Sequence, residues 1–159
     1  MKTVTFAKLA TTALLQAIMI SGSGAQTPPT RATPEPPRIV VVGNDYAFVQ
    51  FPQTIASGKT VFAFRNEGHV RHELSIALLR PGITVQDAMA AIGKGDMGPL
   101  LRGDTVVGIL IARPGESSGG ELLTDLISGR TYVVVCTLKN SPDAEPHTTL
   151  GMYTSFEAR

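Results

Sequence analysis

The last strand–loop–strand segment of the chain, residues 132–156, constrains the fold more than any other stretch. It contains the only cysteine, Cys136, followed by His147 and then Met152. An apolar, β-branched run leads into Cys136 and a second strand pattern begins at Met152, so the loop between them returns towards the cysteine. Thiolate, imidazole and thioether groups are all metal ligands. We therefore expect the two strands to be neighbours, with a metal site at their shared end.

The single cysteine has three possible explanations in an exported domain: an intermolecular disulfide, a buried inert thiol or a metal ligand. From the cysteine count alone, a buried thiol is the commonest case. A histidine 11 residues after Cys136 and a methionine five residues beyond it favour the ligand interpretation. Met152 could also be an ordinary core methionine, but Met89 and Met97 are available for that role and have no ligand residues near them in sequence.

A second histidine ligand has to come from another part of the chain. His72 opens an alternating strand pattern, whereas His69 lies in the preceding turn. We favour His72, because a ligand on a regular element holds its geometry better than one in a turn. A lone histidine at a strand end is more often a surface residue, so this assignment depends on the other ligands. Glu73 could support the ligands from behind or lie on the surface, and we favour the surface position.

Short strands separated by turn residues account for most of the remaining sequence. The predicted strands are residues 39–42, 46–51, 60–64, 73–79, 106–112, 122–126, 131–136 and 152–157. One helix is predicted over residues 84–92, with Thr84 and Asp87 as an N-terminal capping pair and Gly93 as its stop. About eight strands and one short helix indicate an all-β, antiparallel sandwich.

The N-terminal region predicts export. Residues 1–25 combine two lysines, an apolar stretch and a small-residue cleavage site, as in a secretory signal peptide; an uncleaved anchor is the alternative. Residues 26–37 hold five of the 11 prolines and form a proline-rich linker, which leaves residues 38–159 as the domain. We expect a periplasmic or secreted protein with no stable membrane span after cleavage. Its charge of −1 (12 Lys+Arg against 13 Asp+Glu) gives no reason to expect nucleic-acid binding.

Taken together, these residues resemble the cupredoxins, the blue-copper sandwich proteins. Family members place Asn-x-Gly before a ligand histidine, as in residues 66–68 ahead of His72, and Cys, His and Met in that order on the final loop. The final loop also looks like that of copper nitrite reductases. The resemblance covers residues 38–157 and implies a Greek-key β-sandwich with one type 1 copper held by His72, Cys136, His147 and Met152. One departure is the Cys136–His147 spacing of ten intervening residues, against two to four in plastocyanin- and azurin-like loops.

This resemblance implies an electron carrier that cycles between Cu(I) and Cu(II). His147 would be the more exposed ligand and the electron port, and Glu73, Asp143 and Glu145 would form an acidic rim suited to a cationic redox partner. Three histidines are too few for an additional catalytic copper site, so we do not expect an enzyme. Two alternatives remain open: a copper carrier or chaperone that does not transfer electrons, and a metal-free sandwich that serves as an interaction domain.

Overall fold

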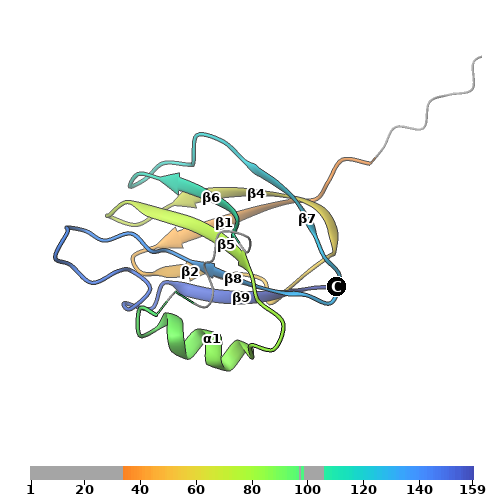
Figure 1. The fold of residues 1–159 in the computed structure, drawn as a ribbon. Helices are drawn as coiled ribbons and strands as arrows, with labels where there is room; N and C mark the ends of the chain where they lie inside the picture. The colour runs from red at the N-terminus through yellow and green to blue at the C-terminus, as the bar shows by residue number, and fades with distance from the viewer. Residues whose placement is uncertain (1–33, 97, 99–105) are drawn as a thin grey trace, which may run out of the picture. The chain divides into compact units, whose positions relative to one another are not determined.

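The structure is a computed structural model that describes residues 34–96, 98 and 106–159 of the 159-residue chain. These residues contain nine strands and one helix, with the strands in two stacked sheets (Figure 1). The elements are β1 (Arg38–Asn44), β2 (Ala47–Val49), β3 (Thr54–Ile55), β4 (Gly58–Asn66), β5 (His72–Leu78), α1 (Val85–Ile92), β6 (Val106–Ala112), β7 (Leu122–Leu126), β8 (Thr131–Val135) and β9 (Tyr153–Ala158). The predicted all-β sandwich with one short helix is confirmed.

The sandwich belongs to one compact unit, Pro34–Arg159. The predicted signal peptide and most of the predicted linker lie outside the described residues and stay predictions. In the part of the chain that the structure describes, no helix has the length and apolar character needed to cross a membrane.

The two sheets are mixed rather than purely antiparallel. The first has the strand order β2-β1-β4-β7 and the second β3-β9-β8-β5-β6. Strand β1 runs parallel to β4, and β3 runs parallel to β9. The expectation of an antiparallel sandwich was therefore wrong for these two pairs. The chain leaves the first sheet through β3 of the second sheet before it returns as β4, and such a crossover is what allows two strands to run in the same direction.

Eight strands lie where the sequence predicted them, and two local features explain the differences. Strand β2 is shorter than its predicted range, because Tyr46 (φ 61°) and Gln50 (φ 49°) leave the extended conformation on either side of it. The added strand β3 has only two residues, too few to produce a period-two pattern. Helix α1 begins as predicted: the Thr84 hydroxyl accepts a hydrogen bond from the Asp87 backbone N–H at 3.1 Å.

Two apolar clusters hold the layers together. The larger lies between the sheets and includes Phe62, Phe64, Leu74, Tyr132 and Phe156. The smaller lies between the second sheet and α1, which covers the outer face of that sheet (Figure 1). Strand β5 is consequently buried on both faces rather than on one, as its alternating sequence had suggested, because it is a central strand of the sheet that the helix covers.

Three connections meet at one end of the sandwich: the β1–β2 turn, the β4–β5 turn and the long β8–β9 loop (Figure 1). The candidate ligands lie on or beside the last two of these connections.

Candidate metal centre

Pairing of β5 with β8 brings the first two candidate ligands together. These strands are antiparallel neighbours, with Ser75 opposite Val135, so the start of β5 and the end of β8 lie at the same end of the sheet. His72 is the first residue of β5, and Cys136 directly follows β8. The β-branched run that forms β8 thus delivers the cysteine to the histidine at the end of a rigid strand.

The β8–β9 loop supplies the other two candidate ligands. The His147 backbone N–H donates to the Leu138 carbonyl at 2.8 Å, which closes the loop beside Cys136. Met152 is fully buried; its N–H donates to the His147 carbonyl (2.9 Å), and its carbonyl accepts from the Cys136 N–H (3.1 Å). Gly43 of β1 makes room for this methionine, since a side chain there would press on the Phe64 ring and on the Met152 methyl group.

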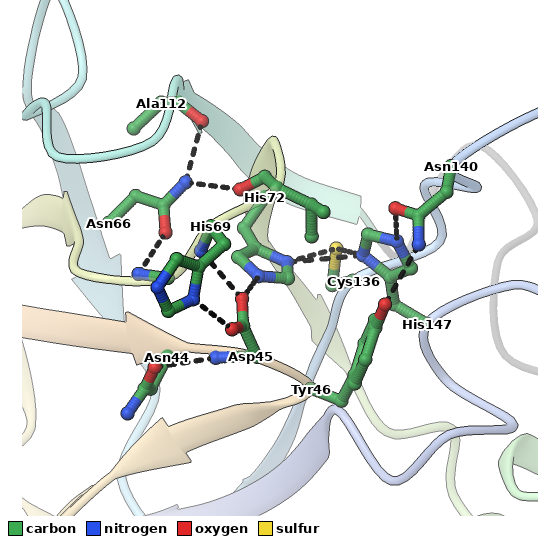
Figure 2. Close-up of polar contacts among 12 residues, drawn as sticks. Asn44, Asp45, Tyr46, Asn66, His69, His72, Ala112, Cys136, Asn140 and His147 are labelled. Carbon is green, nitrogen blue, oxygen red and sulfur yellow. Dashed lines mark hydrogen bonds and ion pairs between the residues drawn. The ribbon is translucent and has the colours of Figure 1, made fainter.

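Three ligand atoms converge at this end of the sandwich (Figure 2). The two histidine Nδ1 atoms are 3.1 Å apart, and the Cys136 sulfur lies 3.3 Å from that of His147 and 3.8 Å from that of His72. The point equidistant from all three atoms lies about 2.0 Å from each, which is the length of a metal–nitrogen bond and close to that of a metal–sulfur bond. Since all three side chains are fully buried, the cluster has the spacing and the enclosure of a metal site.

A hydrogen bond on the far side of His147 and a nearby carboxylate on the far side of His72 leave the two Nδ1 atoms as lone-pair donors. His147 Nε2 lies 2.9 Å from the Asn140 side-chain oxygen, so this nitrogen carries the proton. His72 Nε2 lies 3.6 Å from an oxygen of Asp45 and makes no hydrogen bond among the described residues. Hydrogen bonds from His69 hold the pKa of Asp45 down at about 2, and the resulting carboxylate favours a proton on His72 Nε2. Two lone pairs facing each other at 3.1 Å are unfavourable unless a cation lies between them.

Burial also determines the protonation of the ligands before a metal binds. It lowers the pKa of His72 and of His147, so both imidazoles are neutral at neutral pH. It raises the pKa of the Cys136 thiol to about 11, against the opposing effect of backbone hydrogen bonds from Glu73 and Leu138. The metal-free centre therefore offers two neutral imidazoles and a thiol that has to lose its proton when a metal ion binds.

Glu73 connects the two strands that carry the ligands. Its backbone N–H donates to the Cys136 sulfur at 3.3 Å, and its carboxylate accepts from the Thr137 backbone N–H (2.7 Å) and hydroxyl (2.6 Å). The residue is only 5% exposed. The favoured expectation of a surface carboxylate was wrong, and the alternative holds: Glu73 is buried and supports the site through its backbone and its side chain.

The β4–β5 turn has a specific construction. The Asn66 side chain accepts from the Gly68 N–H (2.9 Å) and donates to the carbonyls of Val70 (2.7 Å) and Ala112 (3.2 Å). A Cβ atom on Gly68 would collide with the Asp45 carboxylate and would lie 3.0 Å from His72 Nε2. The Asn-x-Gly sequence therefore keeps the turn closed and lets the backbone approach the histidine.

His69 lies outside the cluster. Its side chain is 90% exposed, and its Nδ1 atom is 2.6 Å from an Asp45 oxygen, so it faces the other side of that carboxylate (Figure 2). The structure thus brings His72, and not His69, to Cys136 and His147.

The long spacing between Cys136 and His147 does not move the histidine away from the centre. Lys139 pairs with Pro146 in an antiparallel bridge, so residues 139–146 form a side hairpin that is closed off from the rest of the loop. Only two residues then separate Cys136 from the base of this hairpin, and its other end joins directly to His147. We call residues 139–146 the inserted hairpin.

Comparisons with solved structures identify the fold. No family model matches the chain, and no curated protein matches it. Among solved structures, it is similar to dithionite-reduced auracyanin from Roseiflexus castenholzii, with a TM-score of 0.53 and 19% identity over 77% of this chain and 96% of that one. Auracyanin A from Chloroflexus aurantiacus, titled a "blue" copper protein, gives 0.52 and 17% over 79% and 100%, and auracyanin B gives 0.54 and 18% over 80% and 93%. The chain has the cupredoxin fold.

Three residues around this centre were not predicted to take part in it: Asp45, Tyr46 and Asn140. The sequence around Asp45 indicated only a turn, and Tyr46 was predicted to begin the strand over residues 46–51. Asn140 is one polar residue among several in a loop. The expectation that His147 is the more exposed ligand was wrong, because it is as fully buried as His72 and lies next to Asn140 and Tyr46.

Proposed function

We propose that this protein binds one copper ion through His72, Cys136, His147 and Met152 and carries electrons by cycling between Cu(I) and Cu(II). The observation that carries this proposal is the convergence of two imidazole nitrogens and one sulfur, 3.1 to 3.8 Å apart, in a fully enclosed position. Two histidines and one cysteine, with a methionine adjacent, are the ligand set of a type 1 copper site.

Each residue has a distinct role in this proposal. Cys136 binds as the thiolate and releases its proton, while His72 and His147 bind through Nδ1 as neutral imidazoles. Met152, buried beside His147, would supply a thioether. When bound, copper would provide a one-electron couple whose potential depends on that ligand and on the surroundings of the cysteine sulfur. The hydrogen bonds of Glu73 and Leu138 near Cys136 keep these ligands in place in both oxidation states.

Enclosure favours an electron carrier over the alternatives. A copper carrier has to hand its ion to another protein, which requires access to the ligands, whereas all three converging side chains are buried. An electron needs no such opening. An enzyme would need a further metal site or an open coordination position for substrate, and the third histidine, His69, is paired with Asp45. A metal-free interaction domain would leave two buried imidazole lone pairs facing each other without compensation.

Export and the choice of partner also belong to this proposal. The N-terminal sequence and the copper chemistry both suit a periplasmic or secreted protein. Asp143 and Glu145 are exposed on the inserted hairpin, close in sequence to His147, and would favour a cationic redox partner. Glu73 is buried and cannot contribute to this acidic rim. The exposed Lys139 on the same hairpin offsets part of the negative charge of Asp143 and Glu145. Electron-transfer rates with the partner should fall as ionic strength rises; a rate that is unchanged or increases would contradict the rim.

Titration of the protein with Cu(II), followed by visible absorption, tests the function. We expect an intense thiolate-to-copper charge-transfer band that saturates at one equivalent and is absent in Cys136→Ser and in His72→Ala. His69→Ala is the matched control, because it removes an exposed histidine from the same turn and should keep the band. A colourless protein that binds Cu(I) tightly would favour a carrier, and no binding of either ion would refute the copper site.

A further inference from the structure

A chain of hydrogen bonds covers His147 on the side away from the metal centre. His147 Nε2 lies 2.9 Å from the Asn140 side-chain oxygen, and the Asn140 amide nitrogen donates to the Tyr46 hydroxyl at 2.8 Å. The Tyr46 ring stands edge-on to both imidazoles, with its centroid 5.0 Å from that of His147 and 6.1 Å from that of His72 (Figure 2). Asn140 belongs to the inserted hairpin and Tyr46 to the β1–β2 turn, so two separate segments meet over one ligand.

These hydrogen bonds determine which ring nitrogen of His147 carries the proton. The Asn140 amide nitrogen is engaged with Tyr46, which turns the amide oxygen towards the histidine. An amide oxygen only accepts hydrogen bonds, so the proton of the neutral imidazole stays on Nε2 and the lone pair stays on Nδ1. Nδ1 is the atom that faces Cys136 and His72.

The same residues close the centre to solvent. His147 is fully buried, while Asn140 is exposed and Tyr46 partly exposed, so the outermost groups over this ligand are an amide and a phenol. Tyr46 is held in the left-handed region at φ 61°, which a non-glycine residue adopts at a cost. A conformation of this kind persists where surrounding contacts over-determine it, and here those contacts include the Asn140 hydrogen bond and the two imidazoles.

We propose that Asn140 is a positioning residue that holds His147 with Nδ1 towards the metal and, with Tyr46, forms a cap over the centre. If copper carries electrons, as proposed above, they reach the surface through the Asn140–His147 hydrogen bond. No edge of the imidazole ring is exposed for direct transfer to a partner. The inserted hairpin thus has a purpose: it carries the group that orients and covers the second imidazole ligand.

The first test uses the metal-free, reduced protein and needs no copper. Nitrogen-15 NMR of the histidine rings reports which nitrogen carries the proton. We expect His147 to be protonated on Nε2 in the unmodified protein and in Ser141→Ala, a control in the same hairpin. Asn140→Ala should lose this preference, and Asn140→Asp, which keeps an acceptor oxygen, should restore it. Tyr46→Phe keeps the ring but frees the amide, and should give an intermediate result. An unchanged Nε2 proton in Asn140→Ala, or no rescue by Asn140→Asp, would overturn the positioning role.

The second test uses the copper-loaded protein. Loss of an outer partner of a ligating histidine typically weakens metal binding about 10- to 100-fold. We expect that loss in Asn140→Ala, together with faster copper removal by a chelator, and near-unchanged binding in Asn140→Asp and Ser141→Ala. Equal affinity in Asn140→Ala and the unmodified protein would refute the cap. If the unmodified protein binds no copper, the proposed function fails, while the NMR result still decides the positioning role. Thermal unfolding of each variant establishes that it is folded.

Discussion

Copper affinity should depend on pH in a way that the buried thiol determines. Burial raises the pKa of Cys136 to about 11, whereas both imidazoles are already neutral above their ordinary pKa of 6.5. Each bound metal ion therefore displaces one proton, from the thiol alone, between pH 7 and pH 10. Affinity should rise about tenfold per pH unit across this range, and proton competition at pH 7 should cost about 10,000-fold relative to the free thiolate, or roughly 5 to 6 kcal/mol.

The assay is competition for Cu(I) between the reduced protein and a colorimetric chelator of known affinity, repeated at each pH from 7 to 10.5. An ordinary thiol with a pKa of 9.0 would give a slope that flattens above pH 9, so the range from 9 to 10.5 is the decisive one. Cys136→Ser, which has no thiol to deprotonate, serves as the control and should show no slope. A slope in the unmodified protein that levels off at or below pH 9 would refute the conclusion that burial dominates the protonation of Cys136.

Three further predictions concern the surroundings of the ligands. Glu73→Gln removes a buried negative charge and should therefore raise the copper reduction potential. The expected rise is on the order of 100 mV for a unit charge several ångströms away at an effective dielectric of about 20. An unchanged potential in a redox titration would count against this. Gly68→Ala should lower the free energy of unfolding by about 1–3 kcal/mol, since its methyl group meets Asp45 and His72. Gly119→Ala, with open space around it, should be near neutral by the same urea titration. Metal-free stability should fall as pH drops below 6.5, because the unfolded chain takes up protons that buried His72 and His147 resist; a flat urea midpoint from pH 7 to 5 would contradict this.

The sequence predicted the strands of this fold because their signals are local. Residues 106–112 are apolar and β-branched, residues 122–126 are rich in leucine, and the structure places β6 and β7 on the same residues. The ligand residues could also be predicted, since a lone cysteine, a histidine and a methionine follow one another on a single loop. His72 could be preferred over His69 as the second histidine ligand because it is the first residue of a predicted strand.

What the sequence did not predict depends on contacts between distant segments. The burial of Glu73 goes with its hydrogen bonds to Thr137, on the β8–β9 loop. The parallel pairing of β1 with β4 follows from the route of the chain between the sheets. The cap over His147 joins Tyr46 to Asn140, 94 residues apart in sequence. Neither residue has a local pattern that indicates the contact, because its partner lies on a different connection of the sandwich.

X-ray absorption at the copper edge of the loaded protein counts the ligand atoms and measures their distances. We expect two nitrogen ligands at about 2.0 Å and one sulfur at about 2.1–2.3 Å. The short sulfur contribution should vanish in Cys136→Ser and one nitrogen should be lost in His72→Ala, while His69→Ala should leave the spectrum unchanged. A first shell made only of nitrogen and oxygen, or a spectrum that changes in His69→Ala but not in His72→Ala, would contradict this expectation.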